Sequence, residues 1–283
     1  MDTYDQQDLT ADLQRLGLTA GDTVFVHSAL STLGHVKGGA DTVITALLSV
    51  IGDSGTLAAP AFTFEEDPDL FDIANQPSGM GLISERIRTH SQARRSPHRT
   101  HSISAVGPHS AELAHHGPSA WAADGPFWQF VALDARILML GVSYSYCTFF
   151  HLIEQLVQVS YREWIEYEGV LRESNGSERP LTTRTFRQTE RSKGNDFNKF
   201  GTILEKKGLV QIRSVGNAIA RLFKASDALH LGIAEYRKDP NLFVCDGADQ
   251  TLLKDGVRHR WQHYVVDPDK VYDRAINPAV PSA

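Results

Sequence analysis

A histidine and a glutamate three residues apart, His151 and Glu154, stand inside the apolar stretch CTFFHLIEQ, residues 147–155. On a helix the two side chains share one face with Thr148, one turn earlier. An imidazole beside a carboxylate can act as a general base, because the carboxylate fixes the tautomer and stabilises the imidazolium. The same pair could instead supply two metal ligands, or lie on a helix surface without a chemical role. The spacing alone leaves these alternatives open.

A second polar segment follows a predicted strand near the N-terminus. It reads VHSALSTLGHVKGG, residues 26–39, in which the strand ends at His27 and two glycines open a predicted helix. The exposed backbone N–H groups of such a helix start suit a phosphate or pyrophosphate. Neither the Gly-Lys-Ser/Thr order of a P-loop nor a dinucleotide fingerprint is present. An ordinary turn and helix cap is the alternative interpretation.

Two charged segments could contact ligands. The densest basic cluster is RRSPHRTHSISAVG, residues 94–107, whose arginines could form bidentate contacts with phosphates or a carboxylate. An acidic segment follows the second predicted strand and would suit a polycationic acceptor; its carboxylates are Glu65, Glu66, Asp67, Asp69 and Asp72. For both segments the alternative is a solvated loop.

Metal and nucleophile chemistry have less support. The histidine spacings match neither HExxH nor a known zinc pattern, so we expect no metal, although two histidines and a carboxylate could still meet in space. Cys147 stands beside bulky aromatic residues, where a cysteine usually behaves as a small buried hydrophobe. No GxSxG elbow of a serine hydrolase is present.

The elements that must position these side chains predict an α/β fold. Residues 22–30 and 55–64 read as strands on either side of a helix over 38–52, which is the order of a βαβ unit. Residues 135–142, ARILMLGV, form the clearest buried strand, and a helix is expected over 145–158. His151 therefore follows a strand of an α/β sheet, where the loops build sites.

The ends of the chain are less regular. Residues 8–18 predict a short helix capped near Asp8 or Thr10 and ending at Gly17. Residues 166–190 predict a β-hairpin that turns at SNGS. Residues 199–210 and 215–239 read as helical, with a short strand between them. We expect one domain over 1–283 with a peripheral C-terminal portion.

Composition narrows the class of protein. With 283 residues and 41% hydrophobic content, the chain can bury a sizeable core. A net charge of −6 argues against general nucleic-acid binding. Two cysteines make no disulfide framework, which favours a cytoplasmic protein. No apolar run approaches the ~20 residues of a membrane-spanning helix, so we expect no membrane partner. The oligomeric state, monomer or homodimer, stays open.

Four segments taken in chain order resemble the aminoglycoside 3-N-acetyltransferase (antibiotic N-acetyltransferase) family: residues 26–64, 80–88, 94–113 and 137–155. The resemblance runs from about Leu18 to Trp164, and residues 164–283 are more divergent. It implies a central mixed β-sheet flanked by helices, in a fold distinct from the GNAT acetyltransferases. It also implies an enzyme that transfers the acetyl group of acetyl-CoA, without a metal, to the amine of a small molecule.

The resemblance implies roles for particular residues. It makes His151 with Glu154 the catalytic couple and places Thr148 near the thioester. It assigns one segment to the pantetheine and pyrophosphate of CoA: His27, Ser28, Ala29, Leu30, Ser31, Val36, Lys37, Gly38 and Gly39. It places a second loop beside the cofactor: Arg95, Ser96, His98 and Ser102. We expect direct attack of the amine on the thioester, with Thr148 or a backbone N–H stabilising the oxyanion.

The acceptor side departs from the family pattern. The family has His-Pro where this chain has His98-Arg99, and its acidic, glycine-containing loop is shortened here to residues 122–130. From charge, the candidate acceptor-binding carboxylates are Glu65, Asp67 and Asp72. The expected acceptor is an aminoglycoside or related amino sugar. Alternatives are a nucleotide-linked amino sugar in a biosynthetic pathway, a CoA-binding protein without turnover, and a metal-dependent hydrolase.

Overall fold

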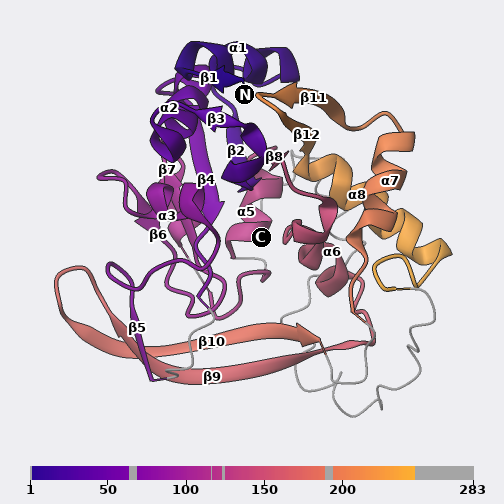
Figure 1. The fold of residues 1–283 in the computed structure, drawn as a ribbon. Coiled ribbons are helices and arrows are strands. Elements are labelled where there is room, and N and C mark those ends of the chain that lie inside the picture. The colour runs from indigo at the N-terminus through magenta and orange to yellow at the C-terminus, as the bar shows by residue number, and fades with distance from the viewer. Residues whose placement is uncertain (1, 64–68, 116, 123–124, 189–193, 246–283) are drawn as a thin grey trace.

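A seven-stranded mixed sheet forms the centre of the computed structural model, which describes residues 2–63, 69–115, 117–122, 125–188 and 194–245 (Figure 1). Strand β2 (Thr23–Ser28) runs parallel to both β4 (Thr56–Pro60) and β8 (Arg136–Leu140). The other four strands join antiparallel: β7 (Ile103–Val106), β6 (Arg94–Arg95), β12 (Ala218–Lys224) and β11 (Gln211–Val215). The predicted α/β fold with a central mixed sheet is confirmed.

Each face of this sheet packs against its own apolar core. Along β2 and β8 successive side chains alternate between the two cores, so Phe25 and Ile137 enter one while Val24 and Leu138 enter the other. Burial on both faces explains why these strands read as continuous apolar runs.

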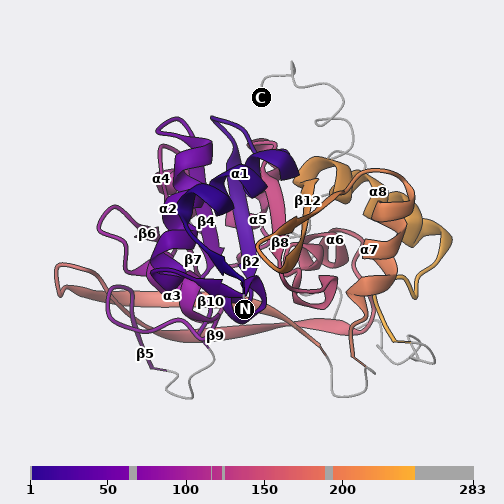
Figure 2. The ribbon, with the colours of Figure 1, turned by 45° about the horizontal axis from the view of Figure 1, so that its top comes forward.

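Helices cover the two faces in separate groups. The first group is α1 (Gln6–Leu16), α2 (Gly39–Ile51) and α3 (Leu82–Arg88). The second is α4 (Ser110–Ala114), α5 (Pro126–Ala132), α6 (Phe150–Leu156), α7 (Phe197–Lys206) and α8 (Ala225–Lys238). Figure 2 shows α7 and α8 gathered on the side of β12, away from α2 and α3.

The N-terminal helix begins earlier than predicted. Its N-cap is Asp5, whose carboxylate accepts two backbone N–H bonds of the first turn, while Asp8 bonds back to the N–H of Asp5. The predicted cap at Asp8 or Thr10 is therefore wrong, because Asp8 is the third helical residue of a capping box. The predicted end at Gly17 is confirmed, and its φ of 112° is the left-handed conformation that glycine adopts readily.

The predicted hairpin is confirmed as β9 (Arg162–Arg172) and β10 (Glu178–Gln188), which lie along the edge of the molecule opposite α1 (Figure 1). Strand β5 (Leu70–Asp72) adds to β9 in a separate three-stranded sheet. A further two-stranded pair joins β1 (Thr3–Tyr4) to β3 (His35–Val36).

The helical prediction for 215–239 is only half right. Residues 225–238 form α8, but residues 218–224 form strand β12 and pair with β8. Burial in β12 alternates, since Ala218, Ala220 and Leu222 are buried while Ile219 is exposed. That period of two is typical of a strand, and Phe223 on the opposite face is buried in the other core. The described C-terminal residues thus complete the main sheet; the single-domain extent of 1–283 stays a prediction.

Candidate active site

A cavity of about 780 Å³ opens where the parallel strands β2, β4 and β8 end. Its lining includes residues from each of these ends: His27, Ser28, Pro60, Phe62, Gly141 and Val142. Helix α6 and the turn before it add Tyr146, Thr148 and His151. The carboxyl edge of parallel strands is the usual place for ligand binding in α/β sheets. The structure thus brings His27, Thr148 and His151 to one cavity.

His151 and Glu154 are in direct contact. Helix α6 is shorter than the predicted 145–158 and begins at Phe150, after a 3₁₀ turn over Tyr144–Tyr146. His151 lies in its first turn, and Nδ1 is 2.5 Å from Oε2 of Glu154. With the Nδ1 proton donated to this carboxylate, Nε2 is the nitrogen available to a molecule in the cavity.

Glu154 is completely buried and has four partners. Oε1 accepts hydrogen bonds from the hydroxyl of Tyr161 at 2.6 Å and from Nδ2 of Asn195 at 2.7 Å. Oε2 contacts His151 and also lies 2.8 Å from Nε of Arg162. A carboxylate withdrawn from water needs such compensation to stay ionised.

The surroundings fix the charge states of the pair. Burial acts to raise the pKa of Glu154, but Arg162 and His151 together lower that pKa below its ordinary value. Burial, followed by Arg162, lowers the pKa of His151, although Glu154 acts in the opposite direction. The imidazole is therefore neutral and the carboxylate ionised at neutral pH, which is the state that a general base requires.

The backbone N–H and the side-chain hydroxyl of Thr148 both contact Nε2 of His27. The backbone N–H of Thr148 donates to Nε2 of His27 at 3.2 Å, and Oγ1 lies 2.8 Å from the same nitrogen. Nε2 has a single in-plane lone pair, so the tautomer of His27 decides whether the hydroxyl donates or accepts. Burial lowers the pKa of His27 to about 3, so this ring stays neutral. Thr148 lines the cavity, and its contact with an oxyanion stays a prediction.

The predicted helix start at the two glycines is confirmed, but neither glycine lines the cavity. Helix α2 begins at Gly39, and Gly38 and Gly39 have φ values of 79° and 62°. Of the nine residues predicted to hold CoA here, three line the cavity: His27, Ser28 and Ala29. Leu30 and Ser31 lie in a 3₁₀ turn, and Val36 is buried against the α1 side of the sheet. Lys37 donates its backbone N–H to Tyr4. Contact of these residues with CoA stays a prediction.

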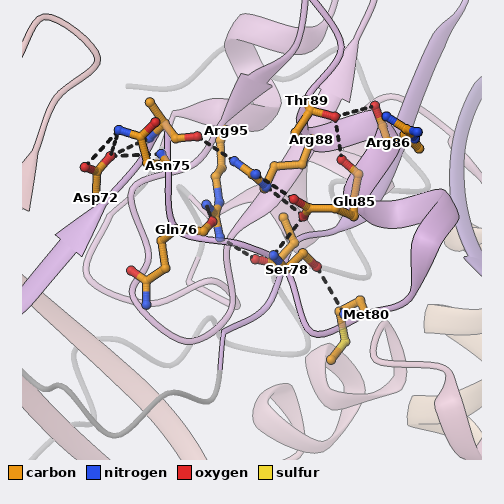
Figure 3. A network of polar contacts seen from close by, with 12 residues as sticks. Asp72, Asn75, Gln76, Ser78, Met80, Glu85, Arg86, Arg88, Thr89 and Arg95 are labelled. Carbon is orange, nitrogen blue, oxygen red and sulfur yellow. Dashed lines mark hydrogen bonds and ion pairs between the residues drawn. The ribbon is translucent and has the colours of Figure 1, made fainter.

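The predicted cofactor loop around Arg95 uses its polar groups inside the protein (Figure 3). Arg95 is 8% exposed and donates to Oγ of Ser102 and to the carbonyls of Ala61, Ile73 and Gln76. Burial first, and then the nearby Arg88, lower the pKa of Arg95 to about 9, so it stays charged at neutral pH.

Glu85 and Arg88 complete this network. Glu85 accepts from Arg88 at 2.6 Å and from the backbone N–H of Ser78 at 2.8 Å, while Arg88 donates to the carbonyl of Ala74. Together with Arg95 they hold residues 73–78, and the next two residues, Gly79 and Met80, line the cavity. The cluster thus positions one wall of the cavity.

Ser96, Ser102 and His98 also have internal partners. Oγ of Ser96 accepts the N–H of Ile103, and Ser102 donates to the carbonyl of Ala61. His98 is completely buried; its Nδ1 accepts two backbone N–H bonds, and Nε2 lies 3.2 Å from the carbonyl of Arg184. Burial lowers the pKa of His98 to about 4. These contacts favour a structural role, and direct contact with CoA stays a prediction.

Of the three predicted acceptor carboxylates, the structure describes Asp72, and Asp72 does not line the cavity. Glu65, Glu66 and Asp67 lie outside the described residues. Asp72 accepts from the backbone N–H groups of Ala74 and Asn75 and lies 3.7 Å from Arg172 (Figure 3). Asp72 therefore stabilises its own turn, and acceptor binding by these residues is untested.

Sequence reasoning missed the partners of Glu154, and it placed His101 in the basic cluster rather than in the cavity. Tyr161, Arg162 and Asn195 follow α6 in the chain without any periodic pattern that would direct them to it. His101 lines the cavity beside Phe62 and Trp121, at ring separations of 4.9 and 4.6 Å. Its position two residues before a buried strand was the one available signal.

Three further expectations can be compared with the described part of the chain. Cys147 is a buried free thiol whose pKa is raised by that burial, as expected for a small hydrophobe. Within the described ranges, no group of three or more His, Cys, Asp or Glu side chains is arranged to hold a metal ion. None of the helices described is long and apolar enough to cross a membrane.

Comparison with known proteins shows the family of the chain. Residues 25–237 match the family model for aminoglycoside 3-N-acetyltransferase. The chain is 29% identical over 250 residues to the SPbeta prophage-derived aminoglycoside N(3')-acetyltransferase-like protein YokD of Bacillus subtilis (strain 168), covering 79% of this chain and 89% of that protein. It is 28% identical over 260 residues to aminoglycoside N(3)-acetyltransferase VII of Streptomyces paromomycinus, covering 80% and 89%.

A solved structure supports the same relationship. The crystal structure of aminoglycoside acetyltransferase AAC(3)-Xa superposes with a TM-score of 0.75 at 28% identity, covering 83% of this chain and 93% of that one. Sheet, cavity and sequence similarity together define a CoA-dependent N-acetyltransferase. The chain belongs to the aminoglycoside 3-N-acetyltransferase family, as the four sequence segments predicted.

Proposed function

We propose that the chain transfers the acetyl group of acetyl-CoA directly to an amino group of an aminoglycoside or related amino sugar, with His151 as the general base. The observation that carries this proposal is the 2.5 Å contact between Nδ1 of His151 and Glu154, made at the wall of the cavity. It leaves Nε2 to take a proton from the acceptor. The names of the relatives support the aminoglycoside as acceptor.

The reaction balances with these groups. Nε2 of His151 accepts a proton from the acceptor amine as its nitrogen attacks the thioester carbonyl carbon. A C–N bond forms, the C–S bond then breaks, and the proton on His151 passes to the departing CoA thiolate. Glu154 holds the imidazole in the required tautomer and offsets the charge that appears on it. General base catalysis of this kind contributes ~10²–10⁴ in rate.

Holding the thioester and the amine together in the cavity contributes further to the rate acceleration. The cavity falls within the ~300–1,000 Å³ range of small-molecule sites, so a thioester and an amine can lie side by side in it. Holding two reactants in register can lower a bimolecular barrier by about 7–11 kcal/mol. Thr148 lines the same cavity, and we assign its hydroxyl or a backbone N–H the contact with the developing oxyanion.

The experiment that tests this proposal measures thiol release from acetyl-CoA with a panel of amines. The panel contains several aminoglycosides and several nucleotide-linked amino sugars, with product mass determined in each case. Turnover with an aminoglycoside is the expected result. Turnover with nucleotide sugars alone would move the acceptor to a biosynthetic class, and CoA binding without turnover on any amine would overturn the proposal.

A further inference from the structure

Arg162 holds the carboxylate partner of the proposed base from the opposite side. It is the first residue of β9, and its side chain is 8% exposed. Nη1 donates to the carbonyl of Phe186 at 2.9 Å, and Nη2 donates to Oδ1 of Asn195 at 2.7 Å. Nε lies 2.8 Å from Oε2 of Glu154. The guanidinium is therefore held by hydrogen bonds at Nη1 and Nη2, both to groups outside the His–Glu pair, while Nε makes an ion pair with Glu154 without hydrogen-bond geometry.

One carboxylate oxygen is shared between two nitrogen bases. Oε2 of Glu154 contacts Nδ1 of His151 and Nε of Arg162, so the two nitrogens lie within about 5 Å of each other. The negative charge of Glu154 is already balanced by a permanent cation. A proton on His151 would place a second positive charge beside the first in a site withdrawn from water, where charges interact strongly.

Other titratable groups around His151 come from several elements. Tyr161 precedes β9 and donates to Glu154, and Tyr236 of α8 acts in turn on Tyr161. On the cavity side lie His101 and His27, of which His27 is kept neutral by burial. The two charges that act on His151 are those of Arg162 and Glu154.

We propose that Arg162 is a positioning residue that cancels the charge of Glu154 and so keeps His151 unprotonated and ready to accept a proton at neutral pH. The inference rests on the proposed role of His151 as base. Glu154 alone would orient the imidazole but would also favour its protonated form. Arg162 retains the orientation and removes that preference.

The test follows the protonation of His151 directly by NMR of the histidine rings, with the His151 signal assigned by its loss in His151→Asn. Arg162→Gln removes the charge and keeps a group able to donate to Glu154. We expect the His151 titration to move up by about one to two pH units. Arg162→Lys retains the charge and is expected to titrate as the wild type does. An unmoved titration in Arg162→Gln would overturn the inference.

Arg184→Gln is the matched control. Arg184 lies on the same hairpin, its side chain is 11% exposed, and its Nε is 2.6 Å from Oε2 of Glu166. This variant removes an arginine of similar burial, paired to a carboxylate that is 31% exposed, without touching Glu154. The His151 titration is expected to stay at its wild-type position. A shift as large as that of Arg162→Gln would show general disturbance and overturn the inference.

A double variant covers the case in which Arg162→Gln does not fold. Glu154→Gln with Arg162→Gln leaves no buried charge unpaired. If the two charges cancel, His151 in the double variant titrates near its wild-type position. If Arg162 has no effect, loss of Glu154 moves the titration down by about one unit or more, which overturns the inference.

Activity separates this inference from the proposed function. The measurement is kcat/KM of the variant divided by kcat/KM of the wild type at each pH. Ionisation of the acceptor affects both enzymes equally and therefore drops out of this ratio. For Arg162→Gln the ratio is expected to rise with pH toward a plateau, whereas structural damage lowers it equally at every pH. Full activity of His151→Asn would refute the base and with it the proposed function. Inactive His151→Asn with an unmoved titration in Arg162→Gln would refute the role of Arg162 alone.

Discussion

Two His–Glu pairs with the same spacing lie in different surroundings in this molecule. His151 contacts Glu154 at 2.5 Å at the cavity wall, and Glu154 is completely buried. His109 contacts Glu112 at 3.2 Å through the same ring nitrogen, but the two side chains are 36% and 53% exposed. Water competes for the second pair, whereas Tyr161, Arg162 and Asn195 complete the first. The chemistry comes from the surroundings of the pair, and the spacing only permits it.

The largest expected effect separates the two histidines by activity. His151→Asn removes the proposed base, and kcat should fall by about 10²–10⁴, the usual contribution of a general base. His109→Asn should change kcat less than about twofold. Thiol release from acetyl-CoA measures both, and CoA binding by calorimetry checks that the cavity is intact. Comparable activity of the two variants would mean that His151 is no more important for turnover than the exposed His109.

The two glutamates should differ next, in stability. Glu154→Gln leaves Arg162 buried beside a neutral amide, and loss of one partner of a buried ion pair costs about 3–5 kcal/mol in the free energy of unfolding. Glu112→Gln removes an exposed contact and should cost less than about 1 kcal/mol. Urea unfolding at pH 7.5 measures both. Equal losses would mean that the network around Glu154 contributes no more than a surface pair.

The buried residue His98, which does not line the cavity, should make the free energy of unfolding depend on pH. His98 has a folded-state pKa of about 4, below the ordinary value of 6.5, so the unfolded chain binds a proton first as pH falls. Its contribution to stability is therefore present above pH 6.5 and is lost between pH 6.5 and 4, by on the order of 3 kcal/mol. In His98→Asn this decline in unfolding free energy should be shallower than in the wild type. Urea unfolding at half-unit pH steps decides.

The smallest effect concerns one hydroxyl. Tyr161→Phe removes the 2.6 Å hydrogen bond to Oε1 of Glu154 and keeps the ring. We expect a loss of about 1–2 kcal/mol in unfolding free energy, since Asn195 and Arg162 still hold the carboxylate. A kcat reduced by less than about tenfold should accompany it. A loss of unfolding free energy as large as that of Glu154→Gln would mean that Tyr161 alone holds the carboxylate, which contradicts the contacts of Asn195 and Arg162.

The sequence predicted the centre of the fold better than its edges. Strands β2, β4 and β8 are buried on both faces, and such runs are readable without an alignment. β12 was taken for helix because AIARLFK runs without a break into the true helix α8. Its strand state depends on pairing with β8, which a local pattern does not contain.

The site was predictable in part for a similar reason. His151 and Glu154 are three residues apart, so their contact is local, but His109 and Glu112 have the same spacing, and only the family resemblance distinguished the two pairs. Asn195 reaches Glu154 from a segment 41 positions later. Arg95 and His98 have residue types that bind ligands, and their internal partners emerge only from tertiary structure.

The position of β8 has a consequence for how the protein is made. This strand pairs with β2 from the beginning of the chain and with β12, which ends at Lys224. While the chain emerges from the ribosome, β8 can be covered on one side only, and its other edge stays without a partner until the whole β9–β10 hairpin and α7 have followed. Helix α6, with His151, is synthesised before that edge is closed. Pairing of such distant strands is slow, so the proposed catalytic centre belongs to the late stages of folding, and a nascent chain stalled before β12 presents an open sheet edge to other chains.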